Sequence, residues 1–160
     1  MFRQVLGLFL VGASLMPWLA HGQNPVKETS AMGSRVLSTK YNEASRALDE
    51  AVNARDLPVI RTALRNRSFP LKIRAAKALA ALKDVDSIPS LLETLKANQV
   101  VMLGGSETQI LQTQCDSTVT SALEAITGMK FKTKSPASAN EIDRVIQESA
   151  QWWRTKKEEH

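Results

Sequence analysis

Apolar residues recur every three or four positions through most of the chain after residue 40, which is the spacing of one buried helix face. The first such pattern begins at Tyr41, and Asp56 then interrupts it as the expected N-cap of a second helix. Pro70 suits the first turn of a third helix. The pattern predicts an all-α protein of five to six helices. The remaining helices are expected to begin at three further polar breaks: Asp86, Asp116 and Asn140.

The helix predicted after Pro70 carries apolar residues on two flanks instead of one. At about 100° per residue, only a narrow arc around Arg74, Lys77 and Ala81 is left for water. A helix with two apolar flanks packs between neighbours on both sides, and its alanines let those neighbours come close. A stacked helical array has this requirement. The flanks are Leu71, Ala75, Ala78, Leu79 and Leu82, and Ile73, Ala76 and Ala80.

The helical pattern lapses over VVMLGGSETQILQTQ, from Val100 to Gln114. This stretch is predicted to be a non-helical insertion, a β-hairpin or irregular segment around Gly104-Gly105. Helix is expected again after Asp116, with Gly128 as its C-terminal stop.

Three segments, RAAKALAALKD, SIPSLLETL and SALEAITGMKF, resemble the HEAT-type helical-repeat family. In that family an inner helix written roughly VRxxAAxALxxL leads through a turn containing Asp into an "IPxL" outer helix. The likeness covers about residues 57–131, and the end of the chain also resembles small exported bacterial HEAT-repeat proteins. It implies a short α-α superhelix (an α-solenoid) that serves as a scaffold for protein binding. Only about two repeats are recognisable, and about three are usually needed, so the Tyr41 and Trp153 helices are expected to act as end caps.

The first 22 residues have the order of a secretory signal peptide. Arg3 precedes an apolar run from Val5 to Met16, and small residues flank His21 before a cut at Gln23. An uncleaved anchor is the alternative, although the run is shorter than the roughly 20 residues that span a bilayer. The sequence predicts export to the periplasm or beyond, with a signal peptide (1–22), a flexible leader (23–39) and a helical-repeat domain (40–157).

The residues that catalysis and metal binding use most are scarce. Without residues 1–22, His160 is the remaining histidine and Cys115 the remaining cysteine. A histidine-based triad, a zinc site and CxxC chemistry therefore cannot be built in the domain. Gly104-Gly105 lacks the later glycine and the lysine of a phosphate-binding loop. We predict a protein that is not an enzyme and that has no cofactor.

Cys115 and the Trp152-Trp153 pair each admit two interpretations. A cysteine near a helix N-terminus can have a lowered pKa and be reactive, or it can be a small half-buried residue that closes the insertion. The tryptophans can stack on a ligand, or they can cover the open end of the helical stack. Trp152 falls at the edge of the apolar stripe, so it is the candidate for partner contact.

Positive charge is concentrated between Arg55 and Lys83, in a chain of formal net charge +5. Either this is an ordinary solvated surface, or it is a docking patch. Three partner classes are open: a protein, an anionic lipid or polysaccharide, or a complex in which the chain is a structural or inhibitory subunit acting through residues 100–114. Nucleic acid is not expected for an exported protein. The candidate partner-binding residues are Arg61, Arg65, Arg74, Lys77 and Trp152.

Overall fold

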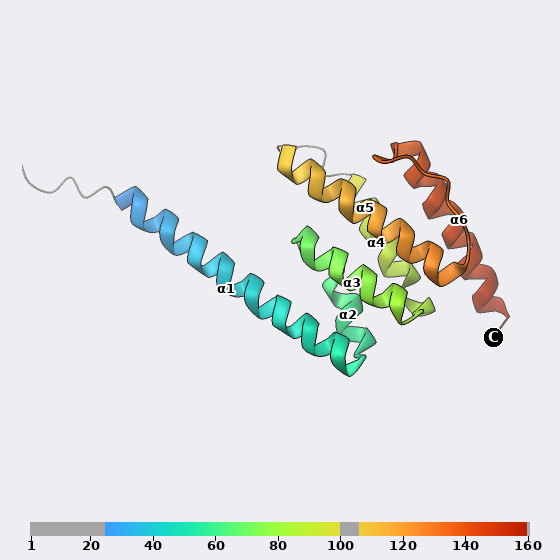
Figure 1. The fold of residues 1–160 in the computed structure, drawn as a ribbon, viewed down its shortest axis with the longest axis horizontal. Coiled ribbons are helices and arrows are strands. Elements are labelled where there is room, and N and C mark those ends of the chain that lie inside the picture. The colour runs from blue at the N-terminus through green and yellow to red at the C-terminus, as the bar shows by residue number, and fades with distance from the viewer. Residues whose placement is uncertain (1–24, 100–105, 160) are drawn as a thin grey trace, which may run out of the picture. The chain divides into compact units, whose positions relative to one another are not determined.

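A computed structural model describes residues 25–99 and 106–159. The chain divides into two compact units, residues 1–35 and 36–160. All regular structure in the described ranges is helical, which confirms the all-α class (Figure 1). The elements are α1 (Pro25–Ala54), α2 (Leu57–Ala63), α3 (Phe69–Ala81), a 3-10 turn (Val85–Ser87), α4 (Ile88–Gln99), α5 (Ser106–Thr127) and α6 (Ala139–Glu158).

Several helix ends lie where the sequence places them, because the local chemistry fixes them. The Asp56 side chain accepts a hydrogen bond from the Val59 N–H at 3.2 Å and so caps α2. Gly128 follows α5 with φ +76°, a left-handed conformation that glycine adopts without a Cβ penalty. At α6, Ser138 and Glu141 form a reciprocal capping box.

Within the second unit, α3 packs most extensively on α5, and α4 packs on α6 and on α5 (Figure 1). α2 packs on α3. Both predicted flanks of α3 contribute fully buried residues, so this helix is enclosed as its two stripes indicate. The α3 side chains in the core are Leu71, Ala75, Ala76 and Leu79.

The predicted insertion is wrong where it can be compared, since residues 106–114 form the first turns of α5. The remainder of that prediction, residues 100–105, lies outside the described residues. Two capping assignments are wrong as well. Asp116 lies in the middle of α5, and Asp86 lies within the 3-10 turn ahead of α4. The first turns of the 22-residue helix α5 were missed because they present glutamines and threonines, which interrupt the apolar period.

The stretch assigned to a leader, residues 23–39, overlaps α1, which begins at Pro25. Its boundary with the domain and the cleavage of residues 1–22 stay predictions. None of the helices in the described residues has both the length and the apolar character that a membrane span requires.

Candidate interaction surfaces

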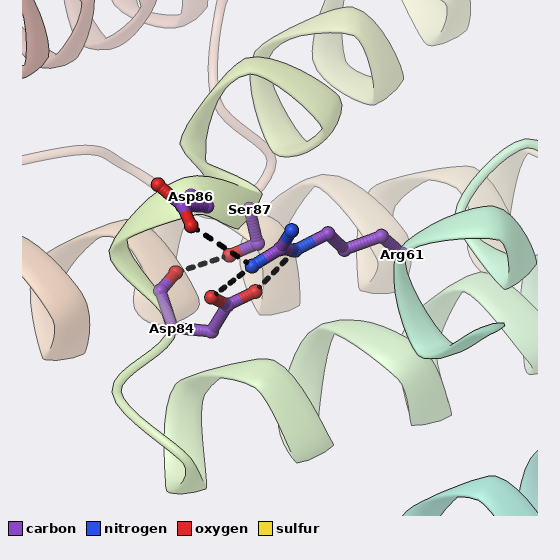
Figure 2. Close-up of polar contacts among 4 residues, drawn as sticks. All are labelled: Arg61, Asp84, Asp86 and Ser87. Carbon is purple, nitrogen blue, oxygen red and sulfur yellow. Dashed lines mark hydrogen bonds and ion pairs between the residues drawn. The ribbon is translucent and has the colours of Figure 1, made fainter. Parts of the chain in front are cut away.

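Arg61, the first of the predicted binding residues, is held by a carboxylate inside the chain. Its Nε donates to Asp84 Oδ2 at 2.7 Å and its Nη2 to Asp84 Oδ1 at 2.5 Å (Figure 2). Asp84 is 7% exposed, and Asp86 adds a longer contact to Arg61 at 3.4 Å. The Asp84 hydrogen bond raises the pKa of Arg61, against the opposing effect of burial. This two-pronged pair ties α2 to the turn between α3 and α4.

A hydrogen bond from a side chain to the backbone fixes the turn at Asp84. The Ser87 hydroxyl donates to the Asp84 carbonyl oxygen at 2.6 Å, inside the core (Figure 2). Ser87 is fully buried, so its hydroxyl needs this acceptor. This bond fixes the backbone of the residue whose carboxylate accepts from Arg61.

Two more of the predicted basic residues also have acidic partners within the chain. Arg65 Nη2 lies 3.3 Å from Glu93 Oε2, and both side chains are well exposed. Arg74 forms an ion pair with Asp49 of α1 and donates to Ser45 Oγ at 2.7 Å. Three of the four predicted basic residues therefore have carboxylate partners within the chain.

Lys77 differs from the three arginines. It is exposed on α3, and among the described residues it has no hydrogen bond or ion pair. It borders a shallow hollow of about 420 Å³ between α3 and α5. The other residues that line this hollow are Ile73, Thr113, Gln114, Ser117, Thr118 and Ser135.

The hollow at Lys77 is the first of three that follow one another across α5. A small second hollow, under residues 133–137, shares Thr113, Ser117 and Ser135 with the first. A third, of about 250 Å³, shares Thr113 and Asp116 with the second and reaches Gln99 and Ile142. We call the combined feature the α5 groove. Its lining is mostly neutral and polar. The charged lining residues are Lys77 in the first hollow, Lys134 in the second, and Asp116 in the second and third.

Asp116 belongs to a hydrogen-bonded chain that passes through a buried amide. Lys72 Nζ donates to Asn98 Oδ1 at 3.1 Å, and Asn98 Nδ2 donates to Asp116 Oδ1 at 2.7 Å. Gln112 Nε2 donates to the Asn98 carbonyl oxygen at 2.6 Å. Burial raises the pKa of Asp116, and the bonds to Asn98 and the charge of Lys72 only partly offset it.

Cys115 lies in the middle of α5 and is fully buried, so a helix N-terminus does not activate its thiol. Burial raises its pKa to about 11. The thiol is therefore protonated near neutral pH and shielded from reagents. The reactive interpretation loses its physical basis, and the residue is more deeply buried than the structural interpretation assumed.

Both tryptophans are half-buried and packed against the core. Trp153, and not the predicted Trp152, borders a hollow of about 350 Å³ whose other lining residues are Val85, Asp86, Lys156 and Lys157. Lys157 Nζ lies 5.1 Å from the centre of the Trp153 ring. That ring already has a cation over it.

In the part of the chain that the structure describes, no three or more His, Cys, Asp or Glu residues are grouped so as to hold a metal ion. Comparison with known protein families, with curated proteins and with solved structures finds no match to this chain.

Proposed function

We propose that this chain is an exported, non-enzymatic interaction module, built as a short HEAT-like array of helical hairpins, that binds a protein partner across the α5 groove. Three observations support the proposal: a repeated turn, the order in which the helices pack, and the one predicted basic residue that remains available.

The turns that end α1 and α3 have the same conformation. Arg55 and Lys83 both have positive φ, 55° and 54°, which is uncommon for residues other than glycine. Each is followed by an aspartate whose N–H reaches back five residues, from Asp56 to Ala51 at 2.8 Å and from Asp84 to Leu79 at 3.1 Å. This bond is the mark of a Schellman helix end. A proline lies in the first turn of the helix that follows each, Pro58 and Pro89.

The packing order of α3 to α6 agrees with two stacked hairpins. α3 contacts α5 and α4 contacts α6, so corresponding helices of successive pairs lie against each other. In a stacked array each hairpin contacts its neighbours in this manner, and the exposed sides of the stacked helices form a continuous binding surface. The α5 groove lies on that kind of surface, since α3 and α5 both line it.

The observation that carries the proposed site is the free charge of Lys77 beside the groove. Arg61, Arg65 and Arg74 are committed to carboxylates of the chain, which weakens the case for electrostatic binding of anionic lipid or polysaccharide. Two lysines, Lys77 and Lys134, line the groove among hydroxyl and amide groups. This lining favours a protein partner, which combines a few ion pairs with neutral hydrogen bonds.

The test compares two charge reversals in an extract of the source cells. Lys77→Glu alters the groove, and Lys96→Glu makes the same change at an exposed position in the last turn of α4. We expect wild type and Lys96→Glu to retain one protein that Lys77→Glu loses, and the purified protein to reproduce the difference. Equal retention by both variants would remove the groove from the proposal. Binding of wild type to phosphatidylglycerol vesicles that vanishes with added salt would instead favour the lipid alternative.

A further inference from the structure

The third hollow of the α5 groove contains a carboxylate that is only half satisfied. Asp116 Oδ1 accepts from Asn98 at 2.7 Å, whereas Oδ2 has no hydrogen bond among the described residues. Asp116 borders both this hollow and the one beside it, so the carboxylate faces the groove. Oδ2 is accessible to solvent and not sealed in the core, so a ligand that enters the hollow can donate to it.

The negative charge of Asp116 also has little compensation from positive groups of the same chain. Lys72, whose charge acts on Asp116, reaches Asn98 and not Asp116, so an amide separates the two charges. Lys134 lines the adjoining hollow and forms no hydrogen bond or ion pair with Asp116. The pKa of Asp116 is raised in spite of Lys72 and Asn98, which indicates that its negative charge lacks full compensation. A cation from outside the chain would supply what Lys72 does not.

The walls of the hollow match a long side chain with a charged tip. The lining includes the apolar residues Ile142, Pro136 and Ala139 and the polar residues Gln99, Gln109 and Gln112. Its volume of about 250 Å³ lies below the range of about 300–1,000 Å³ for drug-sized ligands. A lysine has an aliphatic stem for the apolar wall and three donors for a carboxylate and amide oxygens.

We propose that this hollow is a pocket for a lysine side chain of the partner protein, with Asp116 Oδ2 as the acceptor of its ammonium group. The inference rests on the proposed function, because the lysine is taken to belong to the protein bound in the α5 groove. The bound segment of the partner would then place a lysine at Asp116, and a hydrogen-bond acceptor for Lys77 at the other end of the α5 groove.

The test uses N-acetyl-lysine-N-methylamide as the probe, followed by NMR on the 15N-labelled full chain. The norleucine analogue keeps the aliphatic stem without the charge, and the glutamate analogue reverses the charge, so both serve as controls. We expect saturable shifts at Gln109, Gln112 and Ala139 with the lysine probe, and binding at least about tenfold weaker for either analogue, as a charged hydrogen bond implies.

Variants separate Asp116 from general negative charge. Asp116→Asn keeps the shape of the side chain and the bond from Asn98, and should weaken binding of the lysine probe by about tenfold or more. Glu43→Gln, at an exposed carboxylate of α1 outside the groove lining, should leave binding unchanged. Ala139→Leu fills the hollow from α6 without altering Asp116, and should abolish binding even if Asp116→Asn proves unstable.

Three results would overturn the assignment: equal binding of the lysine and norleucine probes, wild-type affinity in Asp116→Asn, or tighter binding of putrescine than of the lysine probe. The last would point to a free amine in place of a protein lysine. Loss of the lysine probe with Lys77-dependent capture intact overturns the pocket alone. If capture of the partner protein does not depend on Lys77, the proposed function is overturned, regardless of whether the lysine probe binds.

Discussion

The sharpest energetic prediction concerns the pair between Arg61 and Asp84. Arg61→Met keeps most of the aliphatic stem and removes the guanidinium, so the carboxylate of Asp84 loses both short hydrogen bonds. Removing one partner of a buried pair costs about 3–5 kcal/mol, whereas exposed pairs contribute about 0.2–1 kcal/mol. The side chains here are 26% and 5% exposed, which places the pair between those limits. We expect a loss of about 2 kcal/mol in the free energy of unfolding.

The matched control is Arg65→Met, at the other predicted binding arginine beside α2. Its partner is Glu93 at 3.3 Å, and the two side chains are 69% and 63% exposed. This variant should lose less than about 0.5 kcal/mol. At about 4 °C per kcal/mol for a domain of this size, Arg61→Met should lower Tm by about 8 °C.

Urea and thermal unfolding followed by far-UV circular dichroism measure both variants. Adding Asp84→Asn to Arg61→Met removes the stranded charge and should restore part of the lost stability. If Arg61→Met unfolds at the same urea concentration as Arg65→Met, the reasoning from burial is refuted.

Three further predictions concern local features. The pKa of Glu141 is lowered to about 2, chiefly by the Ser138 N–H, so its stabilising contribution is present above pH 4.5 and is lost as pH falls toward 2. Ser138→Ala keeps that N–H but removes the hydroxyl that donates to Glu141 Oε2 at 2.7 Å, so it should move the Glu141 pKa partway upward in an NMR titration. An unchanged value would contradict the hydroxyl's part in the capping box. With a pKa of about 11, Cys115 should react with a disulfide reagent very slowly at pH 8 and quickly in denaturant; fast labelling of the folded protein would show that it is not buried. Gly128→Ala places a Cβ at φ +76° and should cost about 1 kcal/mol in urea unfolding, whereas a variant as stable as wild type would mean that the turn is not held there.

Features fixed by neighbouring residues could be predicted from the sequence. The two apolar flanks of α3 required enclosure on both sides, and the core residues of that helix agree. Asp56 and Gly128 act within a few residues of the helix ends they define. In such cases side-chain chemistry determines local geometry without help from the rest of the fold.

Features that depend on distant partners could not be predicted. Arg61 and Asp84 are 23 residues apart, and Arg74 and Asp49 are 25 residues apart. The spacing of apolar residues in a helix carries no information on such pairs. The arginines were therefore predicted to form an open basic surface. The first turns of α5 were missed for a related reason. Their glutamines and threonines line the groove, and a helix face that borders a polar hollow lacks the apolar repeat used to detect helices.

The most direct measurement of the central claim is site-specific photo-crosslinking in a cell extract. A benzophenone residue replaces Gln114, an exposed residue of the groove lining, or Gln147, an exposed residue of α6 outside it. We predict one dominant crosslinked protein at position 114, displaced by excess wild-type chain but not by excess Lys77→Glu. Equal crosslinking at both positions, or displacement by Lys77→Glu as efficient as by wild type, would contradict the α5 groove as the binding surface.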